Sequence, residues 1–125
     1  MEAQVLFNTV AKHLMVQGRR AMANQGQTCA YRSADGCKCA VGVLIPDELY
    51  DVHMEGLSIA RMLDQLDELE LPAPLAQFIK NDLEPHLHLL MALQAAHDGL
   101  TPEDWAGELR RIARKFKLNL PEVLQ

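Results

Sequence analysis

The sequence predicts a mainly α-helical fold, a compact bundle of five or six helices with one small β-hairpin over residues 28–38 after the first helix. Apolar residues recur at three- and four-residue spacing through most of the chain, which places them on one face of a helix. The Asp35-Gly36 pair supplies the positive φ values that a tight hairpin turn needs. The length of 125 residues is typical of one domain, so we expect residues 1–125 to form a single domain.

Composition and charge exclude several classes of protein. Hydrophobic residues make up 49% of the chain and charged residues 23%, which is typical of a globular domain and not of a disordered one. The net charge of −5 argues against general binding to nucleic acid or to a membrane surface, both of which need a basic patch. No run approaches the ~18 apolar residues of a membrane span, and the N-terminus lacks the basic segment of a secretory signal. The odd number of cysteines, three, favours a reduced, cytoplasmic protein.

The first helix is predicted over residues 2–17. Leu6, Val10 and Leu14 lie on its apolar face, and Gly18 suits its C-terminal end.

The apolar run of residues 39–45, CAVGVLI, is compatible with a buried strand or a short buried helix. We favour a short helix that begins near Cys39. It should end at Ile45, because Pro46 disfavours helical dihedral angles in the residue before it.

Three further helices are predicted before the last one. Ser58 can cap a helix that runs to about Leu69, a short helix surrounds Phe78, and a longer helix runs from Pro85 to His97.

The last helix is predicted over residues 101–116. Thr101 is a cap residue, Pro102 fits the first turn, and acidic residues follow where the helix dipole favours them. Trp105 begins the apolar stripe of this helix, so we expect it to be buried against the preceding helix.

The three cysteines raise the question of a metal. Zinc takes four nitrogen or sulfur ligands, and Cys29, Cys37 and Cys39 lie within eleven residues of one another. The fourth ligand would come from one of three histidines: His13, His53 or His97. The repeated Cys-x2-Cys spacing of zinc fingers is absent, and the alternative is that the cysteines pack as small apolar residues. We therefore expect no cofactor and keep zinc as the alternative.

A nucleophilic role for Cys39 is a second candidate chemistry. A cysteine at a helix N-terminus has a lowered pKa, and Cys39 is expected at such a position. His97 and Asp98 could then supply a base and the group that orients it. The alternative is that Cys39 and His97 only pack together and hold the hairpin against the last two helices.

Two segments carry a resemblance to a known family. Residues 29–50 read C-A-Y-R…G-C-K-C-A-V-G-V-L-I-P-D-E-L-Y, and residues 93–98 read L-Q-A-A-H-D. Together with the first helix and the helix of Trp105, they resemble a family of small uncharacterised proteins frequent in tailed bacteriophages and prophages. The resemblance covers nearly the whole chain and implies a phage or prophage origin and a compact, mostly helical domain. It implies no activity, and Cys37 stands where relatives often have another residue, which argues against a three-cysteine zinc site.

Acidic phage proteins of this size that lack catalytic motifs are often accessory factors. By this analogy we expect a non-enzymatic binding protein in the cytoplasm of the infected host, with a bacterial protein partner and an anti-defence role as one form of that function. The candidate binding residues are Tyr31, Arg32, Asp47 and Tyr50. Two alternatives stay open, a small enzyme that uses Cys39 with His97 and a structural or assembly protein of the phage. The oligomeric state is not predicted.

Overall fold

The computed structural model describes residues 1–23 and 28–125 of the chain. Its longer elements are, in order, α1 Ala3–Gln17, β1 Met22–Ala23, β2 Thr28–Cys29, α2 Ile59–Asp64, α3 Ala73–Phe78, α4 Leu87–Gly99 and α5 Pro102–Lys115. The mainly α-helical class predicted from the sequence is confirmed. Within the described ranges, no helix combines the length and the hydropathy that a membrane crossing requires.

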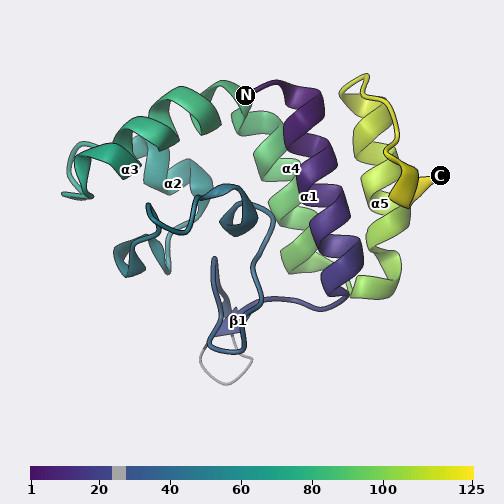
Figure 1. The fold of residues 1–125 in the computed structure, drawn as a ribbon, viewed down its shortest axis with the longest axis horizontal. Helices are drawn as coiled ribbons and strands as arrows, with labels where there is room; N and C mark the ends of the chain where they lie inside the picture. Colours follow the sequence, from purple (N-terminus) through teal and green to yellow (C-terminus); the bar gives the residue numbers. More distant parts are fainter. Residues whose placement is uncertain (24–27) are drawn as a thin grey trace.

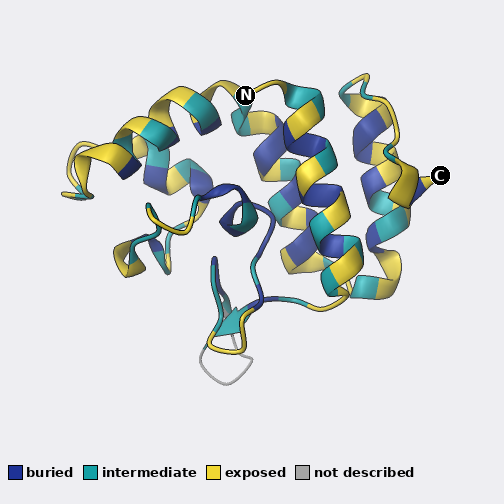
Figure 2. Cartoon of the chain, in the orientation of Figure 1, coloured by how far each residue is buried: buried dark blue, intermediate teal, exposed yellow. Residues whose placement is uncertain are grey.

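The helices fall into two groups (Figure 1). α1, α4 and α5 lie side by side and contact one another, while α2 and α3 extend from this group and α2 packs on α4. Figure 2 shows that the buried faces of α1, α4 and α5 are turned toward each other and the exposed faces outward. One continuous core therefore joins helices from both ends of the sequence.

α1 has the predicted pattern. Its buried residues are Leu6, Phe7, Val10, Ala11 and Leu14. It ends at Gly18, which has a φ of +68° and donates its backbone N–H to the Leu14 carbonyl. Glycine adopts this left-handed conformation at little cost, so the predicted stop at Gly18 is confirmed.

α2 is shorter than predicted. Ser58 does cap it, since its hydroxyl accepts the N–H of Arg61 at 3.1 Å. The helix ends at Asp64 and the chain continues in turns to Glu70, which has a φ of +53°. The acidic residues of this stretch would lie at the negative C-terminal end of a longer helix, which is unfavourable.

The passage from α3 to α4 is helical but irregular. A π turn over Ile79–Leu83 and a 3-10 turn over Glu84–His86 precede the start of α4 at Leu87. Pro85 has no N–H to donate and its ring crowds the preceding turn, so the hydrogen-bond pattern changes there.

The predicted hairpin over residues 28–38 is wrong. β2 pairs backward in the sequence with β1, with Met22 opposite Cys29. Across the Asp35-Gly36 turn there is one isolated bridge, between Arg32 and Lys38.

The physical reason lies at the next position along such a ladder, where Tyr31 is opposite Cys39. Cys39 donates its N–H to the Tyr31 carbonyl, but the N–H of Tyr31 donates to Oε1 of Glu55, and the Cys39 carbonyl accepts the N–H of Val43 as the chain turns. A ladder extends only while both chains offer backbone donors and acceptors to each other, so pairing stops after one bridge.

Residues 39–45 form the short helical segment that the sequence favours over a strand. A turn leads into a 3-10 helix over Gly42–Leu44, and Ile45 before Pro46 is extended with a ψ of 119°. Gly42 passes close beneath Tyr31, because a Cβ atom there would lie 2.0 Å from the Tyr31 carbonyl oxygen. Only glycine leaves room for this backbone approach.

α5 has nearly the predicted bounds, and Trp105 is buried as expected, with 1% of its surface exposed. Its ring stacks on His97 of α4, with centroids 5.5 Å apart. Thr101 caps differently from a standard N-cap. Its hydroxyl accepts no backbone N–H and instead donates to Oδ2 of Asp104.

Candidate functional site

A pocket of about 860 Å³ lies where residues 29–32, residues 50–60 and α4 meet. Residues 29–32 form one wall, residues 50–60 form a second, and α4 contributes a third. Its polar side chains include those of Cys29, Arg32, Glu55, Gln94 and Asp98.

Glu55 holds two of these walls together. Its carboxylate accepts the backbone N–H groups of Tyr31 at 2.9 Å and Arg32 at 3.1 Å, and the hydroxyl of Tyr50 at 2.5 Å. Burial, together with the bond to Glu55, raises the pKa of Tyr50 to about 12. Sequence reasoning missed Glu55, because a lone glutamate in an irregular stretch follows no pattern.

Arg32 is bound on several sides within the protein. Its guanidinium donates to the Ile45 carbonyl at 2.6 Å, pairs with Asp47 at 2.8 Å, and lies over the Tyr50 ring at 4.7 Å. Its Nε atom is buried without a hydrogen-bond partner in the described structure. Tyr31 donates its hydroxyl to the Leu57 carbonyl at 2.5 Å.

The four candidate binding residues are thus near one another, but their polar groups are largely used internally. Tyr31, Arg32 and Tyr50 line the pocket, whereas Asp47 lies outside its lining and is mostly exposed. The bond from Lys38, followed by its charge and that of Arg32, holds the pKa of Asp47 below its usual range.

Cys39 lies at the base of the pocket with 1% of its surface exposed. Gly42 and Val41 direct their N–H groups at its sulfur, which lowers the pKa as expected near the start of a helix. Burial has the larger effect and raises the pKa of the Cys39 thiol to about 12. The lowered pKa that the nucleophilic alternative requires is not found at Cys39, because desolvation of the thiolate exceeds the effect of the local dipoles.

His97 is fully buried and both of its ring nitrogens are engaged. Nε2 accepts the backbone N–H of Ala21 at 3.1 Å, and Nδ1 lies 2.7 Å from Oδ1 of Asp98. Since Nε2 accepts, the neutral ring carries its proton on Nδ1 and donates it to Asp98. His97 and Asp98 pair as predicted, but neither ring nitrogen faces Cys39.

Gln94 connects Cys39 to this pair. Its Oε1 atom accepts the N–H of Val41 at 3.1 Å, and its Nε2 atom donates to Oδ1 of Asp98 at 2.7 Å. Its place in the L-Q-A-A-H-D segment, three residues before His97, is the one sequence signal that could have identified it.

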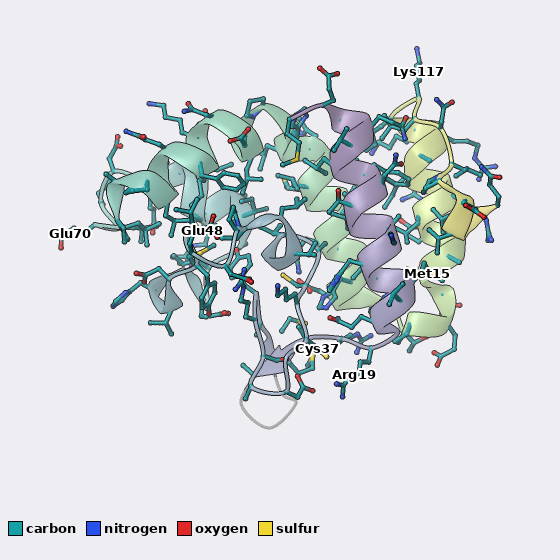
Figure 3. The ribbon with its side chains drawn as sticks, viewed as in Figure 1. Met15, Arg19, Cys37, Glu48, Glu70 and Lys117 are labelled. Carbon is teal, nitrogen blue, oxygen red and sulfur yellow. The ribbon has the colours of Figure 1, made fainter. Side chains whose placement is uncertain are left out.

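The alternative ligand set of Cys29, Cys37 and Cys39 is not brought together in the described structure. Among the described residues, the one group of three or more potential ligands is Cys29, His97 and Asp98, with ligand atoms all within 4.8 Å of one another. Cys37 instead lies beside the C-terminal end of α1, near Arg19 (Figure 3).

The other two candidate histidines also lie elsewhere. Nε2 of His13 contacts the Lys38 carbonyl, and the exposed His53 side chain contacts Asp51.

The group of Cys29, His97 and Asp98 is better suited to a chain of hydrogen bonds than to binding a metal ion. An ion on Nδ1 of His97 would displace the proton that Nδ1 donates to Asp98. The proton would then move to Nε2, where it would face the N–H of Ala21. Burial and the charge of Asp98 raise the pKa of the Cys29 thiol to about 11.

Asp98 is the charged group of this end of the pocket, and 41% of its side chain is exposed. Burial acts to raise its pKa, but hydrogen bonds from His97 and Gln94 outweigh burial and hold the pKa below its usual range. Asp98 is therefore ionised at neutral pH. Its negative charge contributes to the raised pKa values of Cys29, Tyr31 and Cys39.

Comparison of the chain with protein-family models, curated proteins and solved structures finds no match.

Proposed function

We propose that this chain is a non-enzymatic binding protein that holds a protein partner in the pocket between residues 29–32, residues 50–60 and α4. One observation carries the proposal. The two segments that resemble the phage family, residues 29–50 and 93–98, are far apart in sequence and converge on this pocket. The resemblance supports a partner in the bacterial host, with a component of a defence system as one such partner.

The internal bonding of the pocket favours binding over catalysis. Glu55, Arg32 and Gln94 use their polar groups to hold the walls in place, which pre-forms a concave surface. A pre-formed surface loses little conformational entropy when a partner binds.

The alternative of a cysteine enzyme needs a thiolate and a base. The Cys39 thiol is buried with its pKa raised to about 12, and the ring nitrogens of His97 bond to Ala21 and Asp98. A thiol attack would require both arrangements to change, which makes the binding function the better-supported one.

A matched pair of variants tests the proposal. Ala95 is exposed on the pocket wall, whereas Ala73 is exposed on α3 outside the pocket lining. Ala95→Arg should fill the pocket, and Ala73→Arg adds the same side chain elsewhere. The tagged proteins are expressed in a bacterial host, recovered after cross-linking, and compared by quantitative mass spectrometry once their melting temperatures are shown to match.

We expect a specific host protein that the wild type and Ala73→Arg retain and Ala95→Arg loses. A partner that all three retain equally would place the binding surface elsewhere. Recovery of the protein as a stoichiometric component of purified virions would support the alternative of a phage structural protein.

A further inference from the structure

We infer that the pocket takes a basic side chain, a lysine or arginine of the partner, with the Asp98 carboxylate as its counter-charge. This inference rests on the proposed function and names the chemistry of the partner. It is carried by the placement of Asp98 and by the apolar surface that leads to it.

Asp98 ends an apolar stripe on α4. Met91, Ala95 and Asp98 are four and three residues apart, so they share one face of the helix, and all three line the pocket. Met91 is 44% exposed and Ala95 is exposed. Across the pocket, Leu57 and Ile59 add further apolar lining.

This surface fits an amphipathic cation. Lysine and arginine carry an apolar stem of several methylene groups and a charged end. The stem would pack along Met91 and Ala95 while the charged end reaches Asp98.

The N–H groups that the described residues direct at Asp98 leave one of its oxygens for such a ligand. Oδ1 accepts from both Gln94 and His97 at 2.7 Å, which uses its two lone pairs. None of the described residues donates an N–H to Oδ2, and the one further side-chain hydrogen bond to the carboxylate comes from the weakly polar thiol of Cys29. One N–H of an ammonium or guanidinium group could donate a hydrogen bond to Oδ2.

The charges around the pocket favour a cation over an anion. The lining holds two carboxylates, Glu55 and Asp98, against one guanidinium, that of Arg32. Arg32 is already paired with Asp47 and bonded to a carbonyl group. Arg20 is the other nearby cation, and both its Nε and Nη2 atoms donate to the Leu100 carbonyl. An anionic ligand would therefore be repelled by Asp98, and neither Arg32 nor Arg20 would be free to pair with it.

Four probe peptides test the inference. They share the form acetyl-Ala-Leu-X-Leu-Ala-amide, with Lys, Arg, Gln or Glu at X, and they are titrated into the 15N-labelled chain while amide resonances are followed by NMR. We expect the Lys and Arg peptides to shift the resonances of Cys29, Ala95 and Asp98, and to bind about tenfold more tightly than the Gln peptide, as for loss of a charged hydrogen bond. The Glu peptide should bind most weakly. Equal affinity for the Lys and Gln peptides, or tighter binding of the Glu peptide, would overturn the inference.

Two variants assign the effect to Asp98. Asp98→Asn should weaken the Lys peptide about tenfold, while the control Asp67→Asn, at an exposed acid outside the pocket lining, should leave its affinity unchanged. Since Asp98→Asn also alters the bond to His97, Ala95→Arg provides a second variant that keeps that bond and should block the peptide. Unchanged affinity in Asp98→Asn would overturn the inference.

The outcome is separable from that of the proposed function. If no peptide shifts the pocket resonances, the basic-ligand inference fails. A host protein that only Ala95→Arg loses would still support a binding function for the pocket.

Discussion

Glu55 satisfies three donors that come from two segments of the chain, the N–H groups of Tyr31 and Arg32 and the hydroxyl of Tyr50. Gln94 also joins two segments, because it accepts the N–H of Val41 and donates to the carboxylate of Asp98. These two side chains replace the regular hydrogen bonds that residues 30–55 largely lack, because backbone groups in a folded chain need partners.

The first prediction concerns Glu55→Gln. The amide keeps the shape of the side chain but presents N–H donors to groups that themselves donate, so we expect a loss of about 1–3 kcal/mol in the free energy of unfolding. Urea denaturation measures the loss. Glu48→Gln is the matched control, because Glu48 is exposed and should change stability by less than about 0.5 kcal/mol. Equal stability of the two variants would contradict the role given to Glu55.

The second prediction concerns the reactivity of the thiols. Cys29 and Cys39 have pKa values raised to about 11 and about 12, so both are protonated at neutral pH. Alkylation by iodoacetamide, followed by peptide mass spectrometry, should be slow at both sites at pH 7. The half-buried Cys29 should begin to react above about pH 10, and Cys39 only on unfolding. Modification of Cys39 at pH 6 would instead favour the enzyme alternative.

The same thiols give stability a pH dependence. Their pKa values in the folded chain exceed the ~8.5 of an unfolded cysteine. The folded state therefore holds more protons, and the contribution of these thiols is fully present below pH ~8.5 and is lost as pH rises toward about 11 and about 12.

At the scale of elements, α1 and α5 form with nearly the bounds that their local signals predict, and residues 39–45 form the short helical turn that the sequence favours over a strand. The position of the turn relative to Tyr31, however, depends on Gly42. Its missing side chain lets two backbone segments approach closely, and Cys39 lines the pocket next to Tyr31.

The third prediction compares two glycine variants. Gly42→Ala would put a methyl group 2.0 Å from the Tyr31 carbonyl oxygen, so the backbone must move, and we expect a loss of about 3 kcal/mol or more. Gly107→Ala is the control, because Gly107 is exposed in α5 with nothing within 4 Å of its added Cβ. Helix propensity there should stabilise the protein by about 0.5–1 kcal/mol. Thermal melting of both variants, followed by circular dichroism, measures the difference, and a stable Gly42→Ala variant would exclude the close approach.

At the scale of the whole molecule, α4 joins the two parts of the fold. It contacts α1 and α5 on one side and α2 on the other. The stacked pair of His97 and Trp105 lies between α4 and α5, and the same histidine holds Asp98 at the pocket. Packing of the core and charge placement in the pocket are therefore linked through one side chain.

The fourth prediction tests this link with Trp105→Ala. Loss of the buried ring should lower the free energy of unfolding by about 3–5 kcal/mol. Because Trp105 is the one tryptophan of the chain, native fluorescence also reports its burial directly. An emission spectrum typical of a fully solvated indole would contradict the packing. In the variant, the NMR resonances around Asp98 should shift as well, because His97 loses the ring that supports it.

The sequence by itself determined the features that depend on neighbours within a turn or two. The periodicity of α1 and α5, the stop at Gly18, the end of the 39–45 turn before Pro46 and the burial of Trp105 all follow from local spacing and backbone chemistry. The first helical stop and the last helix could be located because caps and proline act within a few residues.

Only the tertiary structure decided the strand pairing, the composition of the pocket and the state of its thiols. The ladder from the Asp35-Gly36 turn stops at Tyr31 because its N–H donates to Glu55, 24 residues along the chain, and not to Cys39. The local rule predicted a lowered pKa for Cys39, and the N–H groups around its sulfur do act that way. Burial beneath other segments makes the net shift of the Cys39 pKa upward, because desolvation depends on atoms that the neighbouring sequence does not supply.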